Sequence, residues 1–218
     1  FHKGLILIHG TGHVGKPPAI KYRYVKNGII SKENRLIALT IKSKIQQLNQ
    51  DVVNTFLSCS IPAIPIDILH FYTKSEELFN IGFIEMAISA FLKNGIVPVF
   101  YGDLLPLPDG NFKVISSDLL TFLLTKTLKP ENVIFLTNVD GVYPDSARLI
   151  DGNYQEVIKE LMLDKITSIR WSDSAATDVS GGMRKKVELA SEISRICRKC
   201  FIGSGYADNI LGKVLKGE

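Results

Sequence analysis

Residues 5–17 read LILIHGTGHVGKP, an apolar run followed directly by a glycine-rich segment. The apolar LILI predicts a buried strand, and the glycines after it predict a tight turn. A turn of this kind exposes backbone N–H groups, which can bind an anion such as phosphate. The start of the sequence therefore indicates a strand that delivers an anion-binding loop.

The same segment differs by one residue from the P-loop pattern G-x-x-x-x-G-K-[ST]. In a P-loop the residue after the lysine supplies a hydroxyl to Mg²⁺ and a backbone N–H to phosphate. Pro17 has neither group, and Pro18 removes a second N–H donor. A P-loop NTPase is therefore disfavoured and is kept only as a third alternative.

Apolar periodicity beyond this loop alternates between helical and strand-like spacing. Helices are predicted over 36–57, 75–93, 118–128 and 183–196, and strands over 61–66, 96–101, 133–137 and 200–203. The prolines in 61–66 indicate an edge strand, and Asp109-Gly110 predicts a hairpin within 104–115. This order predicts an α/β fold, a three-layer αβα sandwich with a mainly parallel sheet and a protruding β-hairpin. Ligands of such sheets bind at the carboxyl ends of the strands.

The composition is that of an ordinary globular protein, with 45% hydrophobic and 22% charged residues among 218. The net charge of +4 is too small to indicate nucleic-acid binding. No apolar run reaches the length of a membrane-spanning helix, so no membrane partner is expected. Three cysteines favour a reducing compartment, the cytoplasm, and Cys197 and Cys200 are interpreted as packed thiols rather than half of a metal site.

Three further loops carry polar or charged residues where ligands are expected. DVSGGMRKK at 178–186 places three cations at the start of a helix, where the helix dipole disfavours them. Either a bound anion such as a polyphosphate offsets that cost, or the segment is a solvated basic helix start. TNVDGVY at 137–143 leaves a buried strand where a nucleotide would bind, although an ordinary Asp-Gly turn is the better explanation when the loop is taken singly. SSD at 116–118 is explained by helix capping through Ser117 or Asp118, or by a buried Asp118 carboxylate that orients lysines.

Together these residues resemble the amino acid kinase superfamily, most closely its isopentenyl phosphate kinase and fosfomycin kinase branch. The resemblance covers nearly the whole chain and rests on an ordered set of motifs. They are HGTG at 9–12, YGD at 101–103, SSD at 116–118, LTNVDGVY at 136–143 and SGGMRKKVELA at 180–190. The resemblance implies an acceptor-binding lobe over 1–115 and an ATP-binding lobe over 116–218, which share one continuous sheet.

The resemblance also implies roles for individual residues. The acceptor phosphate and the transferred phosphoryl group would be bound by Gly10, Thr11, Gly12, Lys16 and Ser117, and ATP by Gly12, Asn138, Asp140, Tyr143, Gly182 and Lys186. Lys186, Asp118 and Lys16 would be catalytic, with Asp118 organising the lysines. Mg²⁺ would arrive bound to ATP, so no protein metal site is expected.

Four departures from the branch pattern are informative. The branch ends its first loop with a histidine that binds the acceptor phosphate, where this chain has Lys16. Ser117 and Asn138 replace a glycine and an aspartate, and His13 is a weak candidate substitute for the missing histidine. A family K-x-G-G-S turn is not found after Phe1, so we expect either that it lies upstream or that the chain is catalytically weakened.

The expected function is ATP-dependent phosphorylation of a small phosphate or phosphonate, with isopentenyl phosphate as the preferred acceptor. The alternatives are a carboxylate-type amino acid kinase and a nucleotide-binding regulatory relative without turnover. By analogy with the family, the expected partners are a small anionic substrate and a second copy of the chain in a homodimer.

Overall fold

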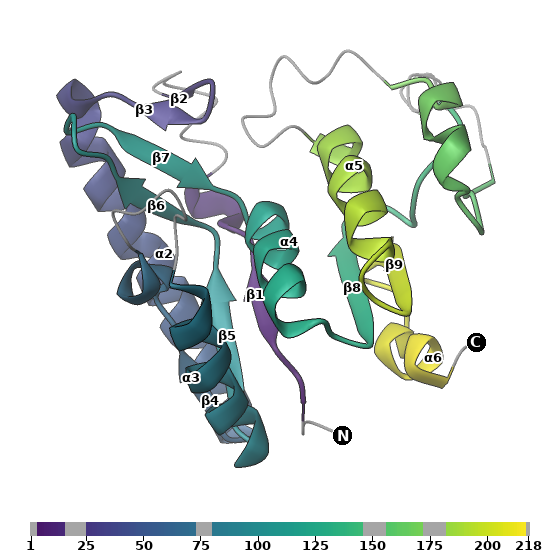
Figure 1. The fold of residues 1–218 in the computed structure, drawn as a ribbon, viewed down its shortest axis with the longest axis horizontal. Coiled ribbons are helices and arrows are strands. Elements are labelled where there is room, and N and C mark those ends of the chain that lie inside the picture. The colour runs from purple at the N-terminus through teal and green to yellow at the C-terminus, as the bar shows by residue number, and fades with distance from the viewer. Residues whose placement is uncertain (1–3, 16–24, 73–79, 146–155, 172–181, 217–218) are drawn as a thin grey trace. The chain divides into compact units, whose positions relative to one another are not determined.

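A computed structural model describes residues 4–15, 25–72, 80–145, 156–171 and 182–216 of the chain (Figure 1). The chain divides into two compact units, residues 1–123 (unit 1) and residues 124–218 (unit 2). Among the described helices, none combines the length and the apolar character that crossing a membrane requires.

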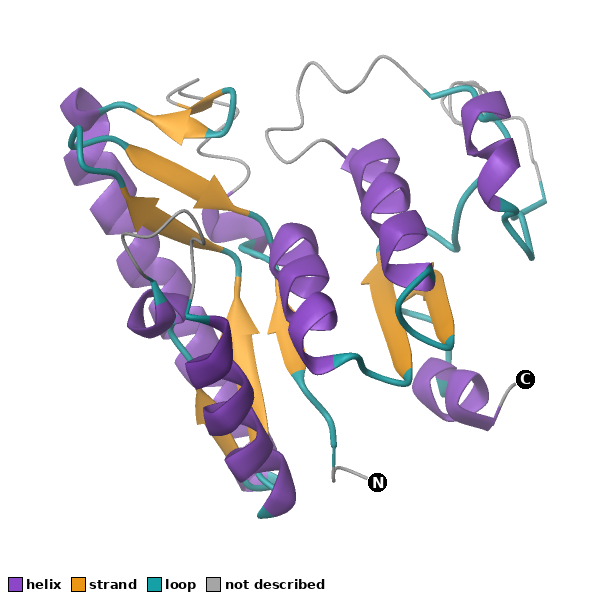
Figure 2. Cartoon of the chain, in the orientation of Figure 1, coloured by secondary structure: helices purple, strands orange, loops and turns teal. Residues whose placement is uncertain are grey.

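Unit 1 contains a parallel sheet of three strands in the order β1-β5-β4 (Figures 1 and 2). The strands are β1 (Leu7–His9), β5 (Val97–Tyr101) and β4 (Ala63–Pro65). All five residues of β5 are buried, which requires cover on both faces of the sheet. The predicted strands 5–8, 61–66 and 96–101 are confirmed, as is the edge position of the proline-containing strand.

Helices α2 (Arg35–Ser58) and α3 (Ile81–Lys93) both pack on β5. Val53 of α2 packs with Val97 and Val99 of β5, and Figure 1 shows α3 in front of the sheet and α2 behind it. Unit 1 therefore has the three layers that the sequence predicts. On α2 the deepest residues are Ala38, Ile41, Ile45, Asn49 and Val53, whereas Leu48, Val52 and Phe56, which lie at helical spacing from Ile41 and Ile45, are only partly buried.

The predicted helix 75–93 corresponds to α3, but residue 80, which the prediction made helical, is not in the helix. Asn80 has extended backbone angles, and its side chain accepts a hydrogen bond from the Phe83 N–H at 3.1 Å. Asn80 is thus the N-cap of α3. The predicted helical residues 75–79 lie outside the described residues. A short 3₁₀ helix, η2 (Ile68–Phe71), precedes them.

An antiparallel sheet in the order β2-β3-β7-β6 completes unit 1. Its strands are β2 (Val25–Lys26), β3 (Ile29–Ile30), β7 (Phe112–Ile115) and β6 (Asp103–Pro106). The predicted hairpin is β6–β7, with Asp109 and Gly110 in its turn. A second hairpin turns at Asn27-Gly28, both with positive φ, and was not predicted although Asn-Gly is a strong hairpin signal. A 3₁₀ helix, η1 (Lys32–Asn34), leads into α2.

Helix α4 (Ser117–Leu128) begins in unit 1 and ends in unit 2. Unit 2 contains the parallel pair β8 (Asn132–Thr137) and β9 (Lys199–Ser204), with α5 (Gly182–Ser194) packed on β9. The 3₁₀ helix η3 (Leu163–Ser168) contacts α5, and α6 (Ile210–Lys216), which was not predicted, contacts β9. Val142, Ile169 and Val187 form a core cluster here. The expected α/β class with mainly parallel pairing is confirmed.

Candidate functional site

The carboxyl ends of β1 and β5 lie side by side in unit 1. The register pairs His9 with Tyr101, and their rings stack with centroids 6.0 Å apart. Gly10 follows His9, and Gly102 follows Tyr101, with the Gly102 N–H donating to the His9 carbonyl at 3.1 Å. The HGTG and YGD motifs therefore meet at one edge of the sheet, where ligands of parallel sheets bind.

Ser117, at the first turn of α4, lies against both of these glycines. A Cβ atom built on Gly10 would be 3.6 Å from Ser117 Oγ, and one built on Gly102 would be 3.0 Å from the Ser117 backbone nitrogen. The second contact is tighter than most that real Cβ atoms make, so a side chain at position 102 would require the Ser117 backbone to shift by a few tenths of an ångström. The structure thus brings together Gly10 and Ser117, two of the predicted acceptor residues.

The remaining residues of the first loop begin a helical turn over residues 12–15. Thr11 is half-buried, Gly12 has φ +51 and His13 is exposed. A positive φ favours glycine, so position 12 suits the residue found there. Lys16, the predicted clamp for the acceptor, lies outside the described residues.

Helix α4 is capped by Ser116, not by the predicted Ser117 or Asp118. The Ser116 hydroxyl accepts a hydrogen bond from the Leu119 N–H at 3.1 Å, three residues along, which is the N-cap geometry. Ser117 and Asp118 are therefore the first two helical residues. Asp118 is half-buried rather than buried, and its predicted contact with lysines stays a prediction.

His9 is fixed by a buried asparagine that the sequence analysis did not single out. The Asn49 amide on α2 lies 3.1 Å from His9 Nε2 and donates to the Val99 carbonyl at 3.2 Å. His9 Nδ1 lies 2.9 Å from the Gly10 carbonyl, so a neutral ring with its proton on Nδ1 satisfies both contacts. Burial lowers the pKa of His9, against the smaller opposite effect of the Gly10 carbonyl. The available signal in the sequence was a polar residue, Asn49, at helical spacing with the apolar residues Ile41, Ile45 and Val53.

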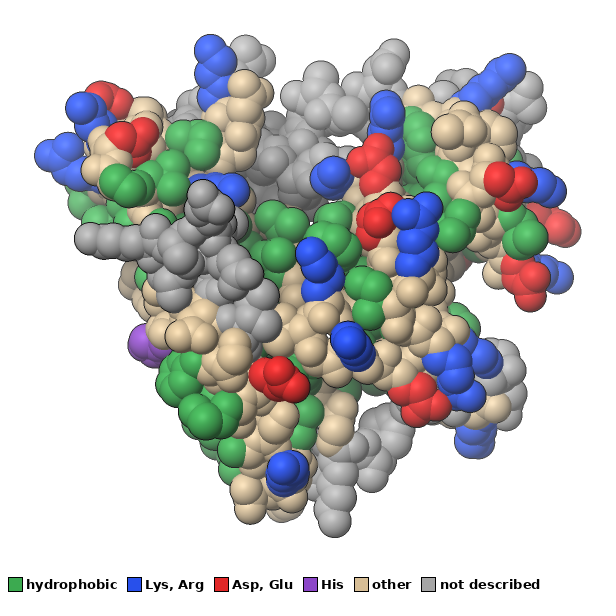
Figure 3. All heavy atoms as spheres, viewed as in Figure 1, with side chains coloured by type: hydrophobic (Ala, Val, Ile, Leu, Met, Phe, Trp, Pro, Cys, Tyr) green, Lys and Arg blue, Asp and Glu red, His purple; other side chains and the backbone are tan. Residues whose placement is uncertain are grey.

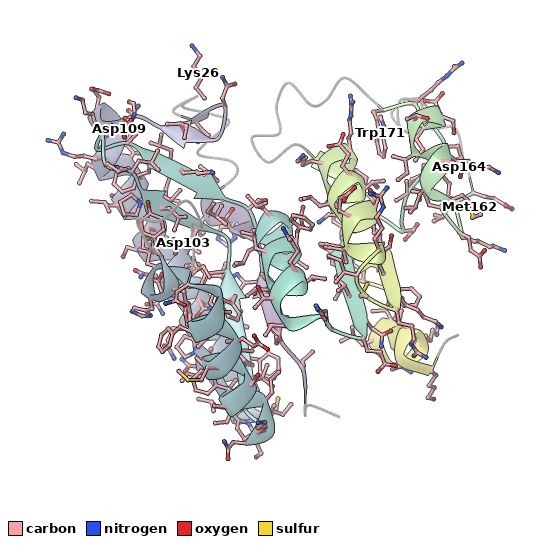
Figure 4. The ribbon with its side chains drawn as sticks, viewed as in Figure 1. Lys26, Asp103, Asp109, Met162, Asp164 and Trp171 are labelled. Carbon is pink, nitrogen blue, oxygen red and sulfur yellow. The ribbon has the colours of Figure 1, made fainter. Side chains whose placement is uncertain are left out.

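A charged cluster made of Lys42, Asp67, Asp103, Tyr101 and Gln46 lies beside this edge and was also missed. Figure 4 shows Asp103 where β5 passes into β6, next to α2. Lys42 Nζ contacts both Asp103 oxygens at 2.7 Å and Asp67 at 3.2 Å. Its members come from α2, β5, β6 and the N-cap position of η2, so their proximity depends on tertiary structure.

Burial is the largest single influence on the pKa values of the three titratable groups Asp67, Tyr101 and Asp103, although at Asp67 the other influences together outweigh it. It raises the pKa of Asp103 to about 6, although the Lys42 ammonium acts in the opposite direction. Burial and the carboxylates of Asp103 and Asp67 raise the pKa of Tyr101. At Asp67 burial favours the proton, but the Leu69 N–H and Lys42 outweigh it and lower the pKa. Tyr101 is therefore protonated at neutral pH and able to donate a hydrogen bond.

In unit 2 the loop after β8 holds three of the six predicted nucleotide residues, Asn138, Asp140 and Tyr143. Asn138 and Asp140 are exposed, and the Tyr143 hydroxyl donates to Asp140 Oδ2 at 3.4 Å. The Val139 N–H donates to Thr137 Oγ1 at 2.9 Å, and the Gly205 N–H donates to the Thr137 carbonyl at 2.7 Å. These hydrogen bonds hold the loop in place, while the Asn138 and Asp140 side chains are exposed.

The three cationic side chains at the start of α5 have different surroundings. Arg184 and Lys185 pair with Glu188 at 3.2 and 3.3 Å, and Figure 3 shows acidic and basic side chains next to one another along this helix. Glu188 thus neutralises part of the positive charge that, in the sequence, suggested a bound anion. Lys186 is half-buried, with Nζ 4.9 Å from the centre of the Phe135 ring on β8. Gly182 starts the helix with φ +61.

The two cysteines of the CRKC segment are packed thiols, as predicted. The Cys197 thiol donates to the Lys199 carbonyl at 3.3 Å, and burial raises the pKa of Cys200 to about 12. All three cysteines are free. Across the described ranges, no group of three or more His, Cys, Asp or Glu residues is arranged to hold a metal ion.

Comparison with known proteins identifies the family of this chain. A family model described as "Amino acid kinase family" matches residues 2–204. This chain belongs to the amino acid kinase family. The family membership confirms the resemblance drawn from the motifs, and it makes the chain a phosphotransferase.

Relatives within the amino acid kinase family include isopentenyl phosphate kinases. The enzyme of Methanocaldococcus jannaschii is 30% identical over 98% of this chain and 78% of its own length. That of Methanothermobacter thermautotrophicus is 33% identical over 98% of this chain and 82% of its own. A solved isopentenyl phosphate kinase structure matches with a TM-score of 0.72 and 25% identity, covering 99% of this chain and 81% of that one.

Proposed function

We propose that this amino acid kinase transfers the γ-phosphoryl group of ATP to isopentenyl phosphate, giving isopentenyl diphosphate. The observation that carries the proposal is the similarity to two isopentenyl phosphate kinases over 98% of the chain. The similarity is not confined to one lobe, so it includes residues predicted to bind the acceptor as well as those predicted to bind the nucleotide.

The acceptor phosphate is assigned to the edge of unit 1 formed by Gly10, Thr11, Gly12 and Ser117. Gly10 and Ser117 lie together there, and glycine at position 10 leaves the backbone accessible to an anion. The Ser117 hydroxyl and backbone N–H groups are donors that suit phosphate oxygens. Lys16 is assigned as the cation that neutralises the acceptor phosphate.

The nucleotide is assigned to Asn138, Asp140, Tyr143, Gly182 and Lys186 of unit 2, and Gly12 is also assigned to nucleotide binding. The exposed polar loop after β8 and the glycine that begins α5 suit this role. Mg²⁺ bound to the ATP phosphates would neutralise charge that develops during transfer. Lys186 would stabilise the same charge, and Asp118 would orient the lysines.

A panel of acceptors tests the proposal. ADP release would be measured with isopentenyl phosphate, dimethylallyl phosphate, fosfomycin and glutamate at matched concentrations. We expect the highest kcat/KM with isopentenyl phosphate, and mass spectrometry of the product should show one added phosphoryl group. Turnover of glutamate alone would contradict the phosphate-acceptor proposal and favour a carboxylate-type kinase.

A regulatory relative without turnover is the second candidate function. It would bind ATP with an ordinary dissociation constant but release no ADP with any acceptor in the panel. Isothermal titration with a non-hydrolysable ATP analogue separates this outcome from a protein that binds no nucleotide. The replacement of the branch's histidine by Lys16 and of its aspartate by Asn138 motivates the comparison.

We also propose a homodimer in the cytoplasm. The dimer rests on analogy with the family, and the compartment rests on three cysteines that are free thiols. Sedimentation at several protein concentrations tests the dimer, and a single species at the monomer mass of 24.2 kDa would contradict it.

A further inference from the structure

The charged cluster around Lys42 is more buried than a surface ion pair, and its Lys42–Asp103 contact is short. Lys42 Nζ lies 2.7 Å from both oxygens of Asp103, whose side chain is fully buried, and 3.2 Å from Asp67 Oδ2. The Lys42 side chain is only 12% exposed. Gln46, one turn further along α2, donates to the same Asp67 oxygen at 3.2 Å.

A buried cation with two carboxylates is a costly way to fill space. Apolar residues of similar size usually stabilise a core at least as well, because charges lose their hydration on burial. Removing one partner, by contrast, leaves a buried charge uncompensated. The cluster therefore restricts geometry more than it adds stability, since each group is satisfied only when α2 and the ends of β4 and β5 keep their positions.

Contacts connect this cluster to the start of the acceptor loop. Lys42 Nζ lies 5.6 Å from the centre of the Tyr101 ring, and that ring stacks on His9. His9 contacts the Gly10 carbonyl through Nδ1 and accepts the Gly102 N–H at its own carbonyl. A continuous path of packed groups therefore leads from Lys42 through Tyr101 and His9 to Gly10.

A second connection runs along β6. Asp103 directly follows Gly102, and the Leu104 N–H donates to Asp103 Oδ1 at 2.7 Å. Gly102 lies against the Ser117 backbone nitrogen. The position of Asp103 therefore influences the position of Gly102 and, through Gly102, that of Ser117, which is assigned to the acceptor.

We propose that Lys42 is a positioning residue for the acceptor loop, acting through Asp67, Asp103, Tyr101 and His9 rather than by touching the substrate. It fixes the ends of β4 and β5, and thereby the place of Gly10 and Ser117. The inference rests on the proposed function where it concerns the acceptor, but its structural part applies to the protein without substrate.

The test compares Lys42→Met with Lys44→Met, a matched change at an exposed lysine two residues along the same helix. In protein labelled with ¹⁵N-glycine, we expect Lys42→Met to move the amide signals of Gly10 and Gly102 and to leave those of Gly141 and Gly182 in unit 2 in place. In the kinase assay the acceptor KM should rise about tenfold or more, because misplaced binding groups weaken substrate positioning, and the ATP KM should change less than about twofold.

An unchanged Gly10 signal in folded Lys42→Met protein would overturn the proposal, as would equal shifts in Lys44→Met. A rise in ATP KM equal to that of the acceptor would also contradict it. If Lys42→Met does not fold, Lys42→Met/Asp103→Asn removes the uncompensated charge, and the Gly10 signal carries the test. Absence of turnover in the unchanged protein would contradict the proposed function alone, because the glycine signals are read without substrate.

Discussion

Because Gly102 has no side chain, the YGD motif can lie close to the SSD motif at the start of α4. A Cβ atom there would lie 3.0 Å from the Ser117 nitrogen and 3.2 Å from the Ile115 carbonyl oxygen, both backbone atoms that cannot rotate away. We expect Gly102→Ala to lower the free energy of unfolding by about 1–3 kcal/mol, as overpacking does, and to weaken acceptor use. Gly10→Ala, whose Cβ would be 3.6 Å from Ser117 Oγ, is the matched control for stability. Equal losses in urea unfolding would contradict this reading.

Asp103 should make stability depend on pH in an unusual direction. Its pKa is about 6 in the folded protein, because burial opposes ionisation, against 3.8 ordinarily. The unfolded chain therefore loses this proton first, and the contribution of Asp103 to the free energy of unfolding falls as pH rises from about 4 to 6. The fall is at most about 3 kcal/mol, since one pKa unit corresponds to about 1.4 kcal/mol.

The measurement for Asp103 is the difference in unfolding free energy between the unchanged protein and Asp103→Asn at pH 4, 5, 6 and 7. Asp67 titrates in the opposite sense, since its pKa is lowered, and its contribution is lost only as pH falls below about 3.8. Its effect lies below this window. A difference that stays constant across the four pH values would show that Asp103 has an ordinary pKa.

At the scale of the element, α4 provides a test of which serine begins the helix. Ser116 accepts the Leu119 N–H, whereas Ser117 lies within the first turn and its carbonyl accepts the Thr121 hydroxyl. Ser116→Ala should therefore cost about 1 kcal/mol of stability, the usual value for a lost N-cap, and Ser117→Ala should cost less. Thermal unfolding of the two variants measures the difference. A larger loss from Ser117→Ala would assign the cap to Ser117, as the sequence pattern first suggested.

Elements with strong periodicity were predictable, and their boundaries depended on local hydrogen bonds. The stripe of α2 and the apolar run of β5 located both elements to within one or two residues. The start of α3 was not predictable from spacing alone, because apolar residues continue at helical intervals before Asn80. The hairpin at Asn27-Gly28 was predictable from its turn residues, which were overlooked beside the stronger signal of the glycine loop.

At the scale of the whole molecule, the predictable part of the candidate site was the part written as contiguous motifs. HGTG, YGD and SSD were recognised one by one, and their meeting follows from parallel strands that end at one edge of the sheet. The Lys42 cluster was not predictable in this way. Lys42 lies 25 residues from Asp67 and 61 from Asp103 in sequence, and only the packing of α2 on the sheet brings them together.

The division into two units predicts that the two substrates protect different parts of the chain. Isopentenyl phosphate should slow amide hydrogen exchange at residues 10–12 and 117–119, whereas an ATP analogue should slow it at 138–143 and in the first turn of α5. The reason is that bound phosphates accept hydrogen bonds from the backbone N–H groups of these loops and helix starts. Lys44→Met protein, changed at an exposed position, should give the same pattern. Protection of unit 2 alone by isopentenyl phosphate would contradict the assignment of the acceptor to unit 1, because a ligand stabilises first the groups that it contacts.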